Sequence, residues 1–404
     1  MAIFWIFASI AILALVGYGL QVVAIRFSLF LSPHYSREGN TLPPFFPPIS
    51  ILKPLKGLDD NLFDNLESFC NQDYPEYEII FSLQHYNDPA YKVAQKIKEK
   101  YPDRNISLIV ERCDDGLNPK VNNLIPAYKI SRYEYVLISD SNVLVDKNYL
   151  TEIVKPMTSP QVGLVSNPIK GVGGRSIGSV LENLHMNSFV LGSVCFLDKF
   201  LKMSCVVGKS MLMRKGDLDA IGGLKACKDV LAEDYMIGKM MKEHGKEVVL
   251  SSYMVENVNH YWGTKKFINR HTRWGKLRWK IGGLKYISEL LGNAVFMSSL
   301  PIVLWEPSRI TISFALLVCL LKAAGDFVVG RLINSDQNPL FFFLAPVKDI
   351  IIGFLWFVPL VSNTVSWRGN RFIIGKNSAL TVCSESGLWA WRYRLVDAIR
   401  ERIA

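Results

Sequence analysis

The sequence of 404 residues has no C-x-x-C pair among its seven cysteines, and the number of cysteines is odd. Both features argue against a disulfide framework and against a zinc site, and they fit a reducing compartment. The sequence also lacks internal repeats and low-complexity segments, and its 12% aromatic content excludes a disordered chain. The cysteines are Cys70, Cys113, Cys195, Cys205, Cys227, Cys319 and Cys383.

Basic residues are missing ahead of the first apolar segment, Ala2 to Ile25, whose one strongly polar side chain is Gln21. A cleaved signal peptide would need a basic start, a shorter apolar run and a small-residue cleavage site. We therefore expect a retained transmembrane anchor over residues 1–26, since a helix of this length reaches about 36 Å and a hydrocarbon core is about 30 Å thick. Arg26 and Arg37 follow the segment, so the positive-inside rule places the next part of the chain in the cytosol.

Charge and hydropathy together narrow the class of protein. Half of the residues are hydrophobic and the mean hydropathy is +0.18, with the apolar residues concentrated at both ends, which excludes a simple cytosolic enzyme. The 46 basic and 36 acidic residues give a net charge of +10. This charge indicates an anionic partner: a nucleic acid, an acidic lipid surface or a phosphorylated substrate.

Residues 49–262 alternate short apolar strands with helices of 10 to 12 residues. This pattern predicts an α/β domain with a mostly parallel sheet, in which ligands bind beyond the carboxyl ends of the strands. The loops Lys53–Asp60, Gln84–Pro89 and Asp140–Asn142 are therefore candidate binding loops. The expected strands are Ile49–Lys53, Tyr77–Leu83, Ile106–Val110 and Tyr133–Ser139, and the expected helices are Asn61–Gln72, Pro89–Lys100, Lys120–Ile130 and Tyr235–His244.

The last third of the chain is again apolar enough for a membrane, over residues 287–363. Ile310–Val329 and Leu340–Val361 are long enough to span, whereas Ile287–Trp305 is broken by Pro301 and is expected to lie in the interface or re-enter it. With the amino terminus outside and the carboxyl end inside, the number of crossings must be odd, so we predict three. Charges within the two spans should face protein or a polar cavity; they are Lys322, Asp326, Lys348 and Asp349.

Two polar segments complete the predicted organisation. Residues 27–48 contain five prolines and are expected to form a stiff linker. Residues 364–404 are expected to form a basic cytosolic tail, in which Leu388–Ile403 resembles an amphipathic interfacial helix. The whole is a multi-pass membrane protein with its α/β domain in the cytosol.

Three stretches of the α/β region carry candidate chemistry. Asp140-Ser141-Asn142 follows an apolar strand, and the oxygens of Asp140 and Asn142 could hold Mg²⁺ or Mn²⁺, although an Asx-turn explains them equally well. Asn118-Pro119-Lys120 opens a helix and is either an anion site that uses Lys120 or a plain helix cap. Asp234 is either a helix N-cap or a base directed into the cleft.

The stretch Lys265–Lys285 holds eight basic residues and no acidic residue, with Trp274 and Trp279 among them. Nucleic-acid binding is one interpretation. The position directly before the membrane segments favours instead an interfacial helix over residues 263–286 that faces anionic headgroups and a diphosphate. Arg270 and Arg273 are three residues apart, so they share one helix face and can grip a diphosphate with forked hydrogen bonds.

Taken together and in this order, these elements resemble the membrane-bound GT-A glycosyltransferases of family 2 type. Within that group the sequence looks most similar to the ceramide glucosyltransferases of family 21. The similarity covers Pro48 to about Arg278, and the single anchor and the basic carboxyl end match as well. The stretches that carry it are Lys53–Gly57, Asn71–Pro75, Asn118–Leu124, Val162–Val165, Met211–Lys215, Ala232–Tyr235 and Arg270–Trp274.

The resemblance implies a GT-A, Rossmann-like domain that moves glucose with inversion from UDP-glucose to the primary hydroxyl of a membrane lipid, with ceramide as the expected acceptor. It implies Asp234 as the base and Asp140, with Asn142, as the ligands of Mg²⁺ or Mn²⁺. The lipid is expected to enter between Lys265–Lys285 and Ile287–Trp305, and no nucleic-acid partner is expected. The implied donor-binding residues are Lys53, Lys56, Asp88, Lys120, Asp140, Arg270, Arg273 and Trp274.

The sequence departs from the expected family pattern at one place. His85-Tyr86-Asn87-Asp88-Pro89 stands where Asp-x-Asp-Asp-Pro is expected, so the role of the first aspartate passes to His85 or Asp88 or is lost. Another acceptor class (a hopanoid, a diacylglycerol or a growing polysaccharide) remains open, although three spans are too few to form a polymer pore. A non-enzymatic polybasic scaffold is the other alternative, and the membrane could be a bacterial inner membrane or that of the Golgi or ER.

Overall fold

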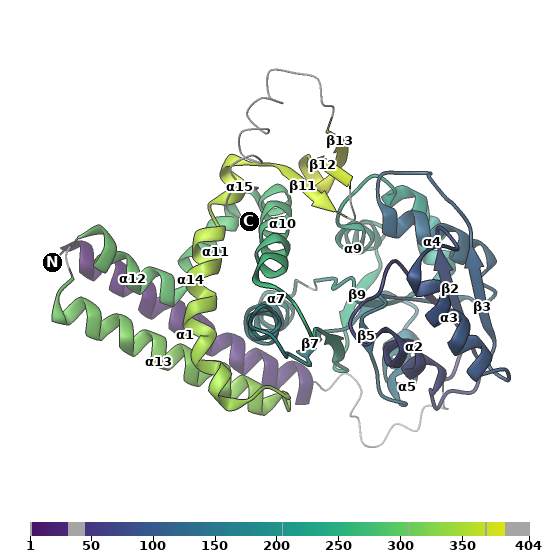
Figure 1. Cartoon of the computed structure of the whole chain (residues 1–404), viewed down its shortest axis with the longest axis horizontal. Coiled ribbons are helices and arrows are strands. Elements are labelled where there is room, and N and C mark those ends of the chain that lie inside the picture. The colour runs from purple at the N-terminus through teal and green to yellow at the C-terminus, as the bar shows by residue number, and fades with distance from the viewer. Residues whose placement is uncertain (1, 31–44, 204, 306, 368–369, 384–404) are drawn as a thin grey trace.

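The computed structural model describes residues 2–30, 45–203, 205–305, 307–367 and 370–383. Figure 1 shows an α/β domain on one side and a group of long helices, built from both ends of the chain, on the other. Much of the predicted linker lies outside the described residues, and so does all of Leu388–Ile403.

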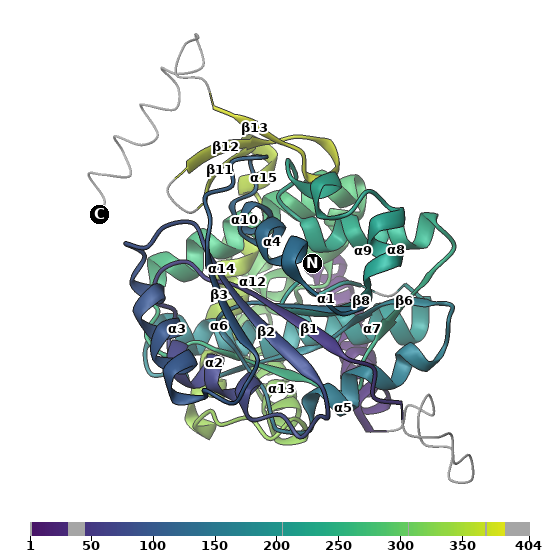
Figure 2. The same ribbon diagram turned by 90° about the vertical axis from the view of Figure 1, so that its right-hand side faces the viewer.

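A seven-stranded sheet with the order β3-β2-β1-β4-β8-β6-β9 forms the centre of the α/β domain (Figure 2). Six strands run in the same direction, and β8 is antiparallel to both of its neighbours. This confirms the expected mostly parallel sheet. The strands are β1 Ile49–Pro54, β2 Tyr77–Leu83, β3 Ile106–Val110, β4 Tyr135–Ser139, β6 Val162–Ser166, β8 Ser210–Arg214 and β9 Glu247–Leu250.

Helices cover both faces of this sheet because successive residues of a strand point to opposite sides. Ile51 packs in the cluster under α2 and α3, and its neighbour Leu52 packs in the cluster under α4 and α9. Every residue of β1 and β2 is buried, as expected for strands covered on both faces. The helices are α2 Leu62–Cys70, α3 Pro89–Lys100, α4 Pro119–Ile130, α5 Tyr149–Val154, α8 Lys215–Ala220 and α9 Glu233–Glu243.

A small second sheet places the Asp140 turn relative to the membrane-side helices. Its order is β5 (Val143–Leu144), β10 (Val255–Val258) and β7 (Ile169–Val172). The backbone N–H of Val258 donates to the carbonyl of Asn142 (3.1 Å), and the chain then leads into α10 (Thr264–Gly282). The predicted interfacial helix thus starts close to the carboxyl end of β4.

Four helices in the described residues are long and apolar enough to cross a membrane: Ile3–Phe30, Ile177–Leu201, Arg309–Leu332 and Pro339–Val361. The second, made of α6 (Ile177–His185), a π-helical turn (Met186–Val190) and α7 (Leu191–Leu201), was not expected from the sequence. In its most apolar 18-residue stretch 72% of the residues are buried inside the protein, against 22% for the first helix. Its sequence is apolar because it packs between α1 and the α/β domain.

Pro301 does not break the segment Ile287–Trp305 as predicted, because it lies inside a continuous helix; the chain bends instead at Gly292 and Asn293. The stretch Thr264–Leu291, which ends with α11 (Ile287–Leu291), meets α12 (Ala294–Leu304) at 69°, so this pair is either one broken span or a re-entrant loop. The remaining helices of the membrane-like part are α1 Ala2–Phe30, α13 Arg309–Leu332, α14 Ala345–Leu355 and α15 Val358–Val361, the last two following a 3₁₀ turn at Pro339–Leu344.

The four charges inside the carboxyl-terminal helices face protein, as predicted. Lys348 pairs with Asp349 (3.0 Å) and Asp326 (3.5 Å), and Lys322 pairs with Asp326 and Asp349. The hydroxyl of Tyr18 on α1 donates to Asp326. Because each charge has a partner of opposite sign, the cluster ties α1, α13 and α14 together without an isolated charge in the apolar region.

The segment after the last apolar helix forms a three-stranded antiparallel sheet at the top of Figure 1, where a basic tail was expected. Its strands are β11 Thr364–Trp367, β12 Asn370–Ile374 and β13 Leu380–Val382. Val365, Phe372 and Ile374 pack with Leu231, and the backbone of Leu380 donates to the carbonyl of Asp229 (2.7 Å). Residues 364–367 and 370–383 therefore form a wall of the α/β domain.

Candidate active site

A cavity of about 1020 Å³ opens at the carboxyl ends of β1 and β4, beside α10. A second cavity of about 600 Å³ lies next to it, and both are lined by Lys56 and Pro119. The structure places nine of the ten predicted site residues at these cavities. Lys56, Lys120, Asp140, Asn142, Asp234, Arg270, Arg273 and Trp274 line the larger one, and Asp88 lines the smaller one.

Lys53 is the predicted residue that lies apart from both cavities. Its ammonium is completely buried over the ring of Phe69 and donates to the main-chain carbonyl of Asp140 (2.8 Å). Burial lowers the pKa of Lys53 well below its usual value. Lys53 thus holds the backbone of the Asp140 turn. Its ammonium does not reach either cavity, where the predicted contact with the donor would have to be made.

Asp140 is held by two lysines. Its Oδ1 lies 2.8 Å from Nζ of Lys120, and its Oδ2 lies 3.0 Å from Nζ of Lys209. Burial opposes the charge on Asp140, but the two ammonium groups outweigh burial and hold its pKa below the usual value. Asp140 is therefore ionised throughout the physiological pH range.

The predicted metal ligands do not fit a divalent cation in this arrangement. Nζ of Lys209 donates to Oδ1 of Asn142 (2.8 Å) as well as pairing with Asp140, so one ammonium engages both proposed ligands. Within the described ranges, no group of three or more His, Cys, Asp or Glu residues could hold a metal ion. A cation at Asp140 and Asn142 would first have to displace Lys209.

Asn118 resolves the two interpretations of the start of α4. Its side-chain oxygen accepts from the backbone N–H groups of Lys120 (2.8 Å) and Val121 (3.1 Å), so it caps the helix and takes up the amides that an anion would need. The Lys120 ammonium instead bridges Asp140 and Glu233, each at 2.8 Å. The start of α4 is therefore a helix cap and no backbone anion site, while the Lys120 side chain contributes its positive charge to the cavity.

Glu233 and Asp234 differ in their surroundings, which sequence alone could not show. Glu233 is 6% exposed, paired with Lys120, and accepts from the side chain of Asn118 (3.2 Å). Asp234 accepts from the backbone N–H groups of Gly208 (2.9 Å) and Tyr235 (2.8 Å) and lines the cavity. Burial and the adjacent Glu233 raise the pKa of Asp234 to about 6, a value suited to a general base near neutral pH.

Gly208 permits this position of Asp234. A Cβ atom at Gly208 would lie 2.5 Å from Oδ2 and 2.8 Å from Cγ of Asp234, closer than atoms can approach. The loop before β8 therefore has to carry glycine where it passes the carboxylate.

A buried carboxylate that the sequence analysis missed anchors the arginine motif of α10. Glu182, on α6, has no solvent exposure and lies 3.3 Å from Arg270 and 2.8 Å from Nε2 of His271. The Arg270 guanidinium also stacks on Trp274 (4.3 Å) and Trp262 (5.1 Å). Trp274 therefore fixes the orientation of Arg270, and Arg270 and Arg273 both reach the cavity.

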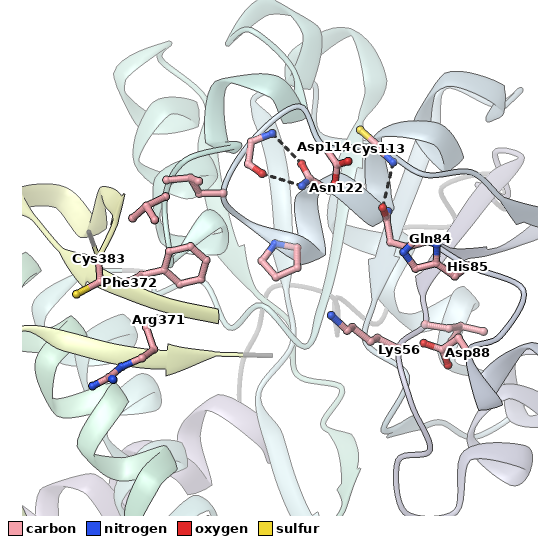
Figure 3. A pocket seen from close by; sticks show the side chains of 15 residues that line it. Lys56, Gln84, His85, Asp88, Cys113, Asp114, Asn122, Arg371, Phe372 and Cys383 are labelled. Carbon is pink, nitrogen blue, oxygen red and sulfur yellow. Dashed lines mark hydrogen bonds between the residues drawn. The ribbon is translucent and has the colours of Figure 1, made fainter. Parts of the chain in front are cut away.

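The smaller cavity lies between the α/β domain and the carboxyl-terminal sheet (Figure 3). In Figure 3 His85 and Asp88 lie on one side, and Arg371, Phe372 and Cys383 lie on the other. The Asp88 carboxylate accepts from the backbone N–H groups of Gly57 and Ala90, each at 2.9 Å. Asp88 thus caps α3 and holds the Gly57 turn (φ 70°), and His85 is left to face the cavity.

Comparisons with known proteins identify the family of the chain. The model of the family described as glycosyl transferase family 21 matches residues 6–380. The chain belongs to glycosyl transferase family 21. Two relatives from Caenorhabditis elegans, ceramide glucosyltransferases 3 and 1, are each 27% identical to this chain. Each match covers 88% of this chain, and it covers 78% and 77% of the two relatives, respectively. A ceramide glucosyltransferase from Komagataella phaffii is 28% identical over 52% of this chain and 46% of its own.

Solved structures are more distant. A mannosyltransferase from Pyrobaculum calidifontis, in complex with GDP-Man and Mn²⁺, matches with a TM-score of 0.47 and 15% identity, over 87% of this chain and 98% of its own. TarS residues 1–349 from S. aureus match with a TM-score of 0.39 and 15% identity, over 82% of this chain and 97% of that one.

As a family 21 member the protein is a glycosyltransferase, which confirms the predicted class; its mostly parallel α/β domain and membrane-like helices confirm the predicted architecture. Lys209, Glu182 and Phe372 are site residues that were not predicted from the sequence. The alternation of apolar residues at 365, 367, 372 and 374 is typical of strands and could have indicated the sheet. Lys209 and Glu182 each lie in an apolar stretch, where an isolated charge is a signal that a partner exists.

Proposed function

We propose that this family 21 enzyme transfers glucose from UDP-glucose to the primary hydroxyl of ceramide, with inversion, to give β-glucosylceramide. The names of the relatives that align with 88% of the chain support the choice of acceptor and sugar. The observation that carries the proposal is one cavity with a cationic side, an apolar side and a carboxylate of raised pKa, Asp234, at its wall.

The cationic side suits the diphosphate of the donor. Arg270, Arg273 and Lys209 line it, and arginine binds phosphate oxygens in pairs with its planar fork. The smaller cavity beyond Lys56 is the place for the nucleoside, because Lys56 and Pro119 line both cavities, so the two are adjacent.

The apolar side suits a lipid. Val190 and Val194 reach the cavity from the π-helical turn and from α7, within the candidate span Ile177–Leu201, and Val206 and Val207 extend the surface. A two-chain lipid loses about 0.8 kcal/mol for each CH₂ that leaves the bilayer, so its hydroxyl must be reached at the membrane surface.

The position of this apolar side changes the expected route by which the lipid enters the cavity. A gap between α10 and Ile287–Trp305 was anticipated, but the described residues that line the cavity include none from Ile287–Trp305. Four valines of the lining come from the helix Ile177–Leu201 and from the loop before β8, so we place the acceptor along this helix. Arg26, near the carboxyl end of α1, favours a cytosolic α/β domain.

In the proposed reaction Asp234 takes the proton of the acceptor hydroxyl as its oxygen attacks the anomeric carbon. The bond to the diphosphate breaks on the opposite face, so an α-linked donor gives a β-linked product. UDP leaves as an anion stabilised by Arg270, Arg273 and Lys209, and no acid is needed on that side. Glu233 keeps Lys120 in place and thereby holds Asp140.

The test is incubation of the purified protein with UDP-glucose and ceramide, followed by product mass and assignment of the anomeric configuration by NMR. Parallel reactions offer UDP-galactose and GDP-mannose as donors, and diacylglycerol and a hopanoid as acceptors. A β-glucosylceramide product that is lost in Asp234→Asn supports the proposal. Exclusive use of another acceptor, an α-linked product, or neither turnover nor thermal stabilisation by UDP would contradict it.

A further inference from the structure

The ammonium of Lys209 occupies the position between the two side chains that the sequence marked as metal ligands. Its Nζ lies 3.0 Å from Oδ2 of Asp140 and 2.8 Å from Oδ1 of Asn142. The backbone of Lys209 is fixed as well, because its carbonyl accepts from the N–H of Asp140 (3.0 Å). Lys209 therefore belongs to the Asp140 turn by two independent contacts.

We propose that Lys209 takes the place of a divalent cation and that this enzyme binds the diphosphate of its donor without metal. An ammonium has three N–H donors, and Asp140 and Asn142 engage two of them, so one donor remains for a phosphate oxygen. The inference rests on the proposed function in so far as the donor is a nucleoside diphosphate sugar.

The charge of the larger cavity makes a metal unnecessary. Eight basic side chains line it against four acidic ones. Asp140 and Glu233 pair with Lys120 and Lys209, and Arg270 and Arg278 pair with Glu182 and Glu289, which lie outside the lining; the bases still outnumber the acids when these two are included. A diphosphate entering this cavity meets an excess of protein cations, which is the role that a metal ion otherwise fills.

A bound divalent cation would have to break both contacts of Lys209 before it could reach Asp140 and Asn142. It would also place two more positive charges beside Lys120 and the displaced ammonium. Glu233 is the other carboxylate near this position. It is a poor additional ligand for the cation, because Lys120 and Asn118 already bind it. The arrangement therefore favours Lys209 over a metal.

The experiment measures binding alone, with three probes. Mn²⁺ alone is titrated into the purified protein and followed by the EPR signal of the free ion, and UDP and inorganic pyrophosphate are titrated by calorimetry in EDTA and in Mn²⁺. The wild type should show no Mn²⁺ site in the cavity, and its affinity for UDP and pyrophosphate should be the same with and without metal.

The variant Lys209→Met keeps the length of the side chain and removes the charge. In EDTA it should bind UDP about 10- to 100-fold more weakly, which is the value of one charge-assisted hydrogen bond. It should gain one Mn²⁺ site, since Asp140 and Asn142 become accessible, and Mn²⁺ should restore much of the UDP affinity. Lys96→Met, at an exposed position of α3, is the matched control and should behave as wild type.

A wild type that binds UDP or pyrophosphate only with Mn²⁺, or a Lys209→Met variant with wild-type affinity in EDTA, overturns the inference. The wild-type titrations decide this even where the variant fails to fold. Metal-free binding of pyrophosphate without transfer of glucose to ceramide would leave the inference standing and overturn the proposed function. The two failures are therefore distinguishable.

Discussion

Replacing Asp234 with asparagine tests the proposed base, because the change keeps the shape of the side chain and removes its ability to accept a proton. General base catalysis contributes about 10²–10⁴-fold, so we expect a loss of this size in kcat. The carboxylate also accepts from the N–H groups of Gly208 and Tyr235. Asparagine keeps one acceptor oxygen, so one of these N–H groups loses its partner, at a cost of about 1–3 kcal/mol in stability.

The pH dependence separates a chemical role from a structural one. Burial and Glu233 raise the pKa of Asp234 to about 6. A base must be deprotonated to act, so wild-type kcat/KM should fall about tenfold per pH unit below pH 6 and be level above it. The residual activity of Asp234→Asn should lack this inflection.

The assay is single-turnover transfer from UDP-glucose, combined with the Kd of UDP and the melting temperature of each variant. UDP binding should stay within a few-fold of wild type. Glu233→Gln is the matched control: it weakens the hold on Lys120 and should affect donor affinity more than the pH profile. Turnover of Asp234→Asn near the wild-type rate, or an unchanged inflection in its profile, would refute the assignment.

Four further changes test the remaining parts of the site. Gly208→Ala should lower kcat and spare UDP binding, because its Cβ would lie 2.5 Å from Oδ2 of Asp234; single-turnover rates check this. Glu182→Ala leaves the Arg270 guanidinium without its buried carboxylate partner and should reduce stability by about 3–5 kcal/mol in denaturant unfolding. Phe372→Ala should raise the KM for UDP-glucose alone, and Val194→Asp should raise the KM for the lipid while UDP affinity in calorimetry stays unchanged.

The sequence predicted the α/β part of the fold closely because local signals determine it. Strands β2 and β3 and helix α3 coincide with their expected bounds, and β1, β4, α2, α4 and α9 differ by one or two residues. Their buried runs and helix starts are short-range features, such as Asp88 capping α3 directly before Pro89. Within the described residues, the unexpected long helix was Ile177–Leu201, whose apolar character serves internal packing as much as a membrane.

The geometry of the site follows from contacts between residues that are far apart in the sequence, such as Lys120 and Glu233, and short-range patterns carry no information about them. The sequence placed Asp140, Asp234 and Arg270 in one cleft through resemblance. It could not show that Lys209 would pair with the Asp140 carboxylate. The two residues are 69 positions apart, and no local sequence pattern indicates a contact over that separation. The same holds for Glu182, whose charge is explained by Arg270 and His271 on a distant helix.

These long-range pairs also explain why the cationic and apolar sides of the cavity meet where they do. Glu182 lies on α6, in the same continuous helix whose next turns carry Val190 and Val194 into the apolar side. The ion pair with Arg270 therefore sets α10 against that helix, and it sets the diphosphate side relative to the lipid side at the same time. A change that loosens this pair should raise the KM of donor and acceptor together, whereas changes on one side alone should affect one substrate.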